Sequence, residues 1–488
     1  MPVPRRWRRA ACAVCLAVVT QTPVVRAQFP LTLQEAIALA QRKGLQASGA
    51  RSARDAARAR DRWFATQYLP SLSIGGTAPS YTRSILAVTQ PDGSTLYKPV
   101  QQTTAGLTAS VIQRLPWTNT TLNLSSSLNQ VQVSGAGGFR TWSSTPFSIG
   151  ITQPLFRANA QQWDRSQQDL RVTSAERRYL EAREDVAIGV TNAFFDLNGA
   201  ALTLKNLEGN AAINDTLYTL NKGRFEVGKI GENDLLQSEL ALLRARAARD
   251  DAKLAYDRML AQFRVAVNLP VGAPVTIVAS NVVPLFDADT LIAVQQARRN
   301  ASTMSDAELS ELSANRAVSE AKWNSGAGGT LSASYGYNAT ANRAPDVYKN
   351  LLDAQQLSVQ MQIPVFQWGA RSAQVEAATA DREAVRNAAE TSRRLLELSA
   401  HFAALQLGQA RRTLALAAKA DTVATKRFDV AYNRYGVSKI AIDNLFIAQQ
   451  EKDQALGSFV QALRAYWLAY FQLRRTTLYD FEKGAPIR

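Results

Sequence analysis

Ser148–Phe156 reads SIGITQPLF, and Ser358–Phe366, 210 residues later, reads SVQMQIPVF. The two stretches share Ser, Pro and Phe and keep apolar residues at corresponding positions. The same offset aligns Arg224–Leu235 (RFEVGKIGENDL) with Arg434–Leu445 (RYGVSKIAIDNL) without a gap. The sequence therefore contains two copies of one structural unit, and repeated units usually stack or close on themselves.

Each copy contains stretches that alternate between apolar and polar residues, as β-strands do. Phe147–Thr152 alternates in this way, and so do Leu122–Ser125, Leu331–Tyr337 and Leu357–Ile363. The polar positions are Ser, Thr, Gln and Asn, with scarcely a charge. A soluble sheet also alternates, but the uncharged polar face favours a membrane β-barrel whose polar side lines water. We expect about four strands in each chain.

A further alternating pair lies at Leu107–Leu115 and Thr121–Val133, joined by Pro116–Asn119. This pair either extends the external loops or adds strands to the barrel. Four strands cannot enclose a channel, because the smallest outer-membrane barrels have about eight. The strands of several chains must therefore combine, which predicts a homo-oligomer.

The helical stretches carry a coiled-coil pattern. Apolar residues alternate at spacings of four and three in two places, Val186, Val190, Ala193, Leu197, Ala200, Leu204, Leu207 and Ala211, and then Leu456, Val460, Leu463, Trp467 and Tyr470. This spacing is the a/d seam of a left-handed coiled coil. The pattern from Arg157 to Gly223 has no internal proline, and a helix of that length spans about 100 Å. We predict a mixed α/β fold, a shared β-barrel continued by a long coiled-coil tube.

The N-terminus is typical of an exported protein. A cluster of four arginines precedes an apolar run from Ala10 to Thr20, and Val25–Ala27 supplies small residues for cleavage before Gln28. Residues 1–27 are therefore predicted to be a signal peptide. Both cysteines, Cys12 and Cys15, lie inside it, and Val14 before Cys15 does not fit a lipoprotein cleavage site.

Charge and motifs exclude several classes of function. The net charge of +16 falls to +11 when five arginines leave with the signal, and the remaining charges are interleaved along helices. This arrangement favours solvated helix faces over a nucleic-acid partner. His401 is the only histidine and lies in a helical pattern, so neither histidine–cysteine metal binding nor histidine catalysis is expected. No phosphate-binding GxxxxGK[ST] motif is present. We predict no enzyme activity and no cofactor.

The order and spacing of several motifs resemble the TolC-like outer membrane efflux proteins. The motifs are Leu31–Ala36 (LTLQEA), Tyr68–Pro70, Gln153–Phe156, Arg224–Val227 and Arg434–Val437. Within the first, Thr32 and Glu35 fit a capping box. The resemblance implies a homotrimer with a twelve-strand barrel in outer membrane lipid and a helical barrel through the periplasm. It also implies a passive exit duct of a tripartite efflux or type I secretion system. Such a duct works with a periplasmic adaptor (membrane fusion protein) and an inner-membrane transporter of the RND, ABC or MFS type.

The resemblance places adaptor docking at the turns between paired helices. These turns read Val227-Gly228-Lys229 and Val437-Ser438-Lys439. Gly228 fits the family and permits the positive φ of a tight helix end, whereas Ser438 departs from it. Ordinary helix turns without a docking role are the alternative.

The resemblance also implies a periplasmic constriction with rings of acidic residues. The expected positions fall on Asn444 and Ile447, neither of which is acidic. Asp443 and Asp234 are the candidate carboxylates, and a three-fold axis would bring each close to its symmetry mates. One residue turns a helix by about 100°, so Asp443 is expected to face a neighbouring helix. We therefore expect a weaker ring, formed by Asp443, Asn444 and Asp234.

The mature chain divides into a first repeat, residues 28–286, and a second repeat, residues 287–488. Asn268–Leu285 interrupts the helical pattern and is predicted to form an irregular belt around the middle of the tube. A periplasmic coiled-coil adaptor or scaffold is the alternative function, because it would share the signal peptide and the heptads. The uncharged alternating strands favour the channel, whose cargo is set by its inner-membrane partner.

Overall fold

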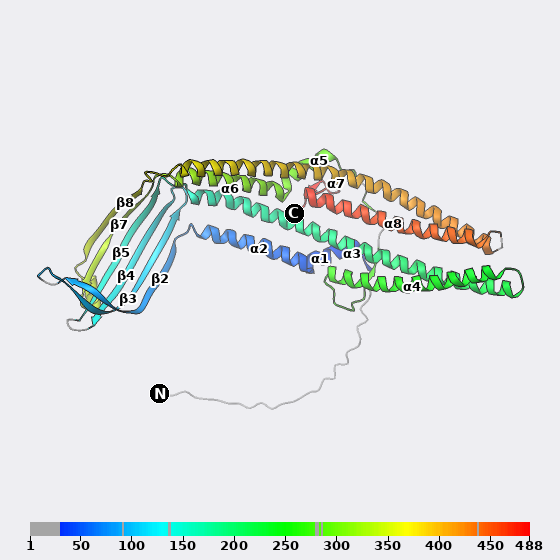
Figure 1. Ribbon diagram of the computed structural model, residues 1–488, viewed down its shortest axis with the longest axis horizontal. Coiled ribbons are helices and arrows are strands. Elements are labelled where there is room, and N and C mark those ends of the chain that lie inside the picture. Colours follow the sequence, from blue (N-terminus) through cyan, green and yellow to red (C-terminus); the bar gives the residue numbers. More distant parts are fainter. Residues whose placement is uncertain (1–29, 90–91, 135–137, 279–282, 285, 437–438) are drawn as a thin grey trace, which may run out of the picture.

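The computed structural model describes residues 30–89, 92–134, 138–278, 283–284, 286–436 and 439–488. The predicted signal peptide, residues 1–27, lies outside the described residues. An antiparallel sheet occupies one end of the molecule, and a row of long helices extends from it (Figure 1). Within the described part of the chain, no helix combines the length and the apolar character needed to cross a membrane.

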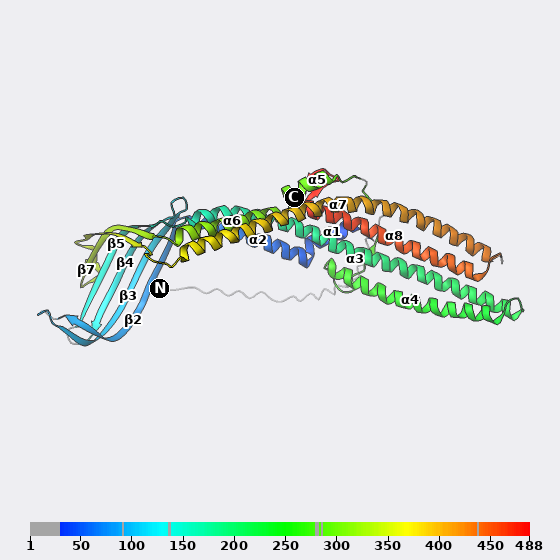
Figure 2. The same cartoon turned by 45° about the horizontal axis from the view of Figure 1, so that its top comes forward.

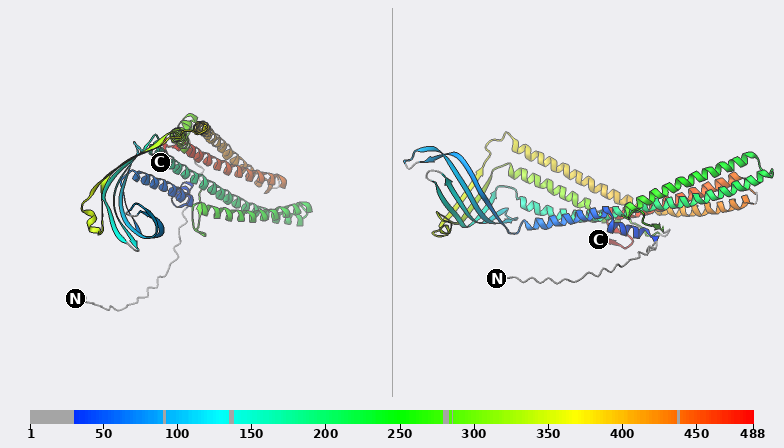
Figure 3. Two further views of the ribbon diagram at one scale, coloured as in Figure 1. Left: turned by 60° about the vertical axis from the view of Figure 1, so that its left-hand side comes forward. Right: turned by 90° about the horizontal axis from the view of Figure 1, so that it is seen from below.

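Six long strands form the sheet. In sheet order they are β2 (Ser71–Thr89), β3 (Thr95–Leu115), β4 (Thr120–Ser134), β5 (Phe139–Leu155), β7 (Gly328–Ala341) and β8 (Leu352–Gln362). Every neighbouring pair is antiparallel, and the sheet is strongly curved (Figure 3, left). The prediction of about four strands was wrong, because β3 and β4 are full strands rather than extended loops. A short 3-10 helix, η1 (Ala344–Tyr348), lies between β7 and β8.

The helices follow the periodicity of the sequence. They are α1 (Leu33–Lys43), α2 (Leu45–Thr66), α3 (Ala160–Glu226), α4 (Glu232–Ala266), α5 (Thr290–Asn300), α6 (Ser302–Asn324), α7 (Ala370–Gly436) and α8 (Ile442–Thr477). Both α3 and α7 have 67 residues, and they begin and end at the offset seen in the sequence. The predicted seams are largely buried, as shown by Val186, Val190 and Leu197 on α3 and by Leu463 and Tyr470 on α8.

The long helices lie side by side in a single layer. Near the sheet, α3 contacts α2 and α6, and α6 contacts α7. Farther away, α3 contacts α4 and α8, and α8 contacts α7. One edge of the layer therefore carries α2 and α4, and the other carries α7 (Figure 1). These edges continue into the sheet, since β2 follows α2 and β8 precedes α7. We call them the α4 edge and the α7 edge.

Short elements surround the middle of the helical layer. β1 (Pro30–Leu31) pairs in parallel with β6 (Thr276–Ile277), and β9 (Tyr479–Asp480) pairs with β10 (Ala485–Pro486). The first turn of α1 is closed by the expected capping box between Thr32 and Glu35. α5 lies against the middle of α7 and the C-terminal end of α8, and the C-terminal segment lies beside it (Figure 2).

The largest hydrophobic core lies at this level. Phe194, Phe263, Leu463 and Tyr466 are almost completely buried there and join α3, α4 and α8. The middle of the layer is therefore its best-packed part, and both helical halves extend from it.

Candidate functional site

The end of the helical layer far from the sheet contains the predicted docking and constriction residues. We call residues 206–237 and 427–453 of this region the helical tip. The turn between α3 and α4 is a Schellman motif: Gly228 N donates to Phe225 O at 2.8 Å, and Lys229 N donates to Arg224 O at 2.8 Å. Gly228 adopts a φ of 70°, which favours glycine because a side chain is strained there. Val227 and Lys229 are exposed on either side of it.

The turn between α7 and α8 shares one of these bonds. Lys439 N donates to Arg434 O at 2.9 Å, at the 210-residue offset from the bond of Lys229. Val437 and Ser438 lie outside the described residues, and Lys439 is exposed. A docking role for either turn stays a prediction.

Side-chain hydrogen bonds connect the helix pairs α3–α4 and α7–α8 close to the turns. The buried Tyr435 hydroxyl donates to Asn221 Oδ1 at 3.2 Å. Gln237 Nε2 on α4 donates to Asp443 Oδ1 on α8 at 2.9 Å. Leu217, Phe428 and Leu445 form a small buried apolar cluster beside the first of these bonds.

The candidate constriction residues are all exposed in the single chain. Asp443, Asn444 and Asp234 lie in the first turns of α8 and α4. Asp443 is directed to α4 of its own chain through Gln237, in agreement with the expectation that it faces a neighbouring helix. Asp234 and Asn444 have exposed side chains beside this link. An acidic ring stays a prediction.

Toward the tip, the contact between α3 and α8 becomes partly polar. Two of the seam positions after Ala211 are occupied by Asn214 and Asn221, both buried. Nearby, Asn206 and Asn210 donate their Nδ2 groups to the two carboxylate oxygens of Asp453, at 2.6 and 2.8 Å. Buried amides at seam positions specify register but lower stability. The tip interface is therefore weaker than the apolar core in the middle of the layer.

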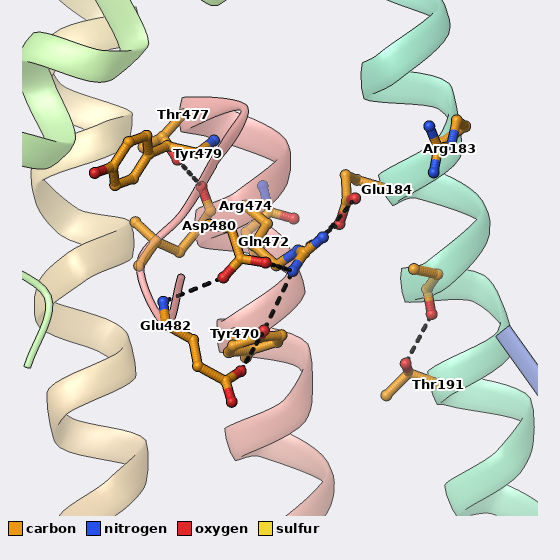
Figure 4. Close-up of polar contacts among 12 residues, drawn as sticks. Arg183, Glu184, Thr191, Tyr470, Gln472, Arg474, Thr477, Tyr479, Asp480 and Glu482 are labelled. Carbon is orange, nitrogen blue, oxygen red and sulfur yellow. Dashed lines mark hydrogen bonds and ion pairs between the residues drawn. The ribbon is translucent and has the colours of Figure 1, made fainter. Parts of the chain in front are cut away.

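A buried ion-pair network joins α3 to the C-terminal segment (Figure 4). Arg474 contacts Glu184 at 3.1 Å and Asp480 at 2.8 Å, and all three side chains are largely buried. Burial disfavours the charged guanidinium, but the hydrogen bonds and charge of Glu184 outweigh it, and the pKa of Arg474 is raised. Its Nη1 also donates to the Tyr470 hydroxyl at 3.2 Å. Sequence reasoning missed this network, because Glu184 and Arg474 are 290 residues apart.

Both edges of the helical layer carry exposed apolar seams. On α7, the residues recur in steps of seven or fourteen, and each is about half exposed or more: Leu395, Phe402, Leu416, Val423 and Val430. On α4, exposed leucines follow alternating coiled-coil spacings: Leu236, Leu240, Leu243 and Leu254. Such seams normally pack against another helix. Within the described residues, neither seam is covered by its own chain.

His401 lies on α7, exposed and edge-on to the ring of Phe402. Among the residues that the structure describes, no group of three or more His, Cys, Asp or Glu side chains is placed to hold a metal ion.

Comparison with known families identifies the fold. Residues 100–269 match the family model described as outer membrane efflux protein. This part of the chain is therefore similar to the outer membrane efflux proteins. This confirms the resemblance inferred from the sequence and agrees with the predicted outer membrane location. No curated protein sequence matches the chain.

Solved structures of outer membrane channels share the architecture of this chain. The CmeC channel of Campylobacter jejuni aligns with a TM-score of 0.66 at 15% identity, over 93% of this chain and 87% of CmeC. VceC of Vibrio cholerae aligns with a TM-score of 0.65 at 12% identity, over 93% of this chain and 97% of VceC. The open state of the MtrE channel of Neisseria gonorrhoeae aligns with a TM-score of 0.62 at 13% identity, over 91% of this chain and 88% of MtrE. At these identities the comparison establishes the shared fold.

Proposed function

We propose that this protein is the outer membrane channel of a tripartite efflux or type I secretion system, and that three copies form one passive exit duct. The observation that carries the proposal is the coincidence of unpaired edges. β2 and β8 are the two edges of the sheet, and α4 and α7 are the two edges of the helical layer. β2 lies on the same side of the molecule as α4, and β8 lies on the same side as α7.

Unpaired edges of this kind favour contact with another chain. Edge strands present unpaired backbone groups that readily pair with another chain. The α4 and α7 edges differ from each other, so a contact between them is head-to-tail and closes into a ring when the rotation permits. A ring of copies would pair β8 with the β2 of its neighbour and would cover both apolar seams of the helices. The assembled ring would consist of a closed β-barrel that continues into a closed helical barrel.

The proposed duct opens at the helical tip. Its closed form is held by the Tyr435–Asn221 and Gln237–Asp443 bonds and by the amides around Asp453. The polar seam allows α7 and α8 to separate from α3 and α4 at the tip while the apolar core stays packed. Opening then requires the segment 434–448 to move outward when a periplasmic adaptor engages the turns at Gly228 and Lys439.

The proposal is tested by the location and mass of the native protein. A particle extracted only from the outer membrane, with the mass of three mature chains, supports the duct. A soluble monomer in the periplasm would contradict it and would favour a coiled-coil scaffold.

A matched pair of variants tests the edge contact itself. Val423→Glu places a charge in the α7 seam and is expected to yield monomers, because the carboxylate would be buried without a partner. Thr422→Glu changes the adjacent exposed position outside the seam and should leave the assembly intact. Equal assembly of the two variants would argue against a contact through this seam.

A further inference from the structure

The hairpin of β3 and β4 has no counterpart in the second half of the chain. In each half, strands connect a helix near the sheet (α2 or α6) to a 67-residue helix, through β2 and β5 in the first half and through β7 and β8 in the second. α1 and α5 begin at Leu33 and Thr290, 257 residues apart, whereas α3 and α7 begin 210 residues apart. The first half is therefore longer by 47 residues (257 − 210) in this region. The segment Thr95–Ser134, which forms β3 and β4, accounts for most of them.

The hairpin spans the full height of the sheet. β3 pairs with β2 as far as Ser71–Ile112, at the helix-side end of both strands. The turn Pro116–Asn119 then lies against the start of α3 and is held there by Asn159. Asn159 Nδ2 donates to Pro116 O at 2.9 Å, and its Oδ1 accepts from Gln162 N at 3.1 Å as the cap of α3. One side chain therefore ties the turn to the helical layer.

A second side chain fixes the same turn from β5. Gln153 Nε2 donates to Thr118 O at 2.9 Å, and Gln153 also contacts the buried Thr120 hydroxyl. Asn119 adopts a φ of 61°, which closes the tight connection. A hairpin that extended an external loop would have no reason to reach this end of the sheet.

At its helix-side end, the hairpin also continues both faces of the sheet. Paired residues of neighbouring strands point to the same face. One row crosses five strands with apolar side chains, Leu72, Val111, Leu124, Ile149 and Tyr335. The adjacent row, on the opposite face, consists of Ser73, Ser110, Ser125, Ser148 and Gly336. Ser73 and Ser110 share a hydrogen bond of 2.9 Å between their hydroxyls.

We propose that β3 and β4 are part of the membrane wall, with Val111 and Leu124 facing lipid and Ser110 and Ser125 facing water. An apolar outer face and a polar inner face are what a barrel strand in lipid requires. The proposal rests on the trimer proposed above. With six strands from each copy, three copies form a barrel of eighteen strands instead of the twelve that the family resemblance implies.

This strand number changes the shape of the duct. Barrel diameter grows roughly in proportion to strand number, and barrels of about 16–18 strands enclose an aqueous channel. The barrel would be about half as wide again as one of twelve strands. Among the described residues, each copy contributes four helices across the layer near the sheet and four toward the tip. The membrane part is therefore wider than the helical part, and the helical tip limits the size of the cargo.

Single cysteine variants at one depth of the sheet test this placement. Val111→Cys and Ser110→Cys probe the two faces of β3, and Ile149→Cys and Ser148→Cys probe the same two rows on β5. The sequence has two cysteines, both in the predicted signal peptide, so each mature variant carries one thiol. Outer membranes are treated with a charged maleimide that does not enter lipid, and labelling after denaturation confirms that every thiol is reactive.

We expect strong labelling of the Ser110 and Ser148 variants and at least a tenfold lower rate for the Val111 and Ile149 variants. Labelling of Val111→Cys at the rate of Ser110→Cys, with Ile149→Cys still protected, would place the hairpin outside the wall and overturn the inference alone. Equal labelling of all four variants would mean that the sheet does not lie in lipid at all. That result would overturn the proposed channel as well.

Discussion

At the scale of single residues, two adjacent arginines form ion pairs that differ strongly in burial. Arg474 pairs with Glu184, which is 3% exposed, whereas Arg475 pairs with Asp185, which is 53% exposed. Removing one partner of a buried pair leaves an uncompensated charge and costs about 3–5 kcal/mol. An exposed pair contributes about 0–1 kcal/mol.

Arg474→Met is therefore expected to lower the thermal unfolding midpoint of the purified protein markedly. Arg475→Met, the matched control, should change it little. Equal midpoints for the two variants would show that the Arg474 network does not stabilise the junction between α3 and the C-terminal segment.

The tyrosines of the same core predict how stability depends on alkaline pH. Burial raises the pKa of both Tyr466 and Tyr470 to about 12. Folding therefore favours the neutral phenols, and their stabilising contribution is complete below about pH 10, the usual tyrosine value, and lost as pH rises through about 12. Titration of tyrosinate absorbance should show a late component near pH 12 that disappears in the double variant Tyr466→Phe and Tyr470→Phe. Ionisation of all tyrosines in one step near pH 10 would contradict this account of burial.

At the scale of the elements, the junction between the helix pairs controls the tip. Tyr435→Phe removes the hydroxyl that bonds to Asn221 and leaves the ring in the apolar cluster. We expect a higher single-channel conductance in planar bilayers, because the closed tip loses one of its connecting bonds. Tyr432→Phe, one turn earlier and partly exposed, is the control and should conduct as the unchanged protein does. An unaltered conductance in both variants would show that the Tyr435 hydroxyl does not help to keep the helical tip closed.

Ion selectivity tests the candidate carboxylates at the entrance. Asp443 is engaged by Gln237, while Asp234 is exposed in the first turn of α4. Carboxylates gathered around a symmetry axis favour cations. Asp443→Asn and Asp234→Asn should therefore each shift the reversal potential in a salt gradient toward lower cation preference. Unchanged reversal potentials in both variants would rule out a selective ring at these positions.

Local periodicity predicted most of the elements, and long-range pairing explains what it missed. The coiled-coil seam of α3, the capping box at Thr32 and the glycine turn at Gly228 depend on residues a few positions apart. The number of strands could not be obtained in this way, because β3 contains the four consecutive polar residues Gln101–Thr104, which interrupt its alternation. The Tyr435–Asn221 bond depends on the relative register of two helices, and no local pattern encodes it.

At the scale of the whole molecule, the single chain is an incomplete wall. Its sheet has two free edges, its helical layer has two exposed apolar seams, and the edges of both coincide on the same sides (Figure 1). A compact fold of one chain would bury these features inside itself. Their parallel arrangement along the entire length of the molecule instead favours copies placed side by side around an axis.

Electron cryomicroscopy of the particle extracted from outer membranes tests this claim most directly. We predict a three-fold ring in which β8 of each copy pairs with β2 of the next, with eighteen strands above a tube of twelve helices. A particle whose sheets remain open at β2 and β8, or whose α4 and α7 edges face solvent, would contradict the account.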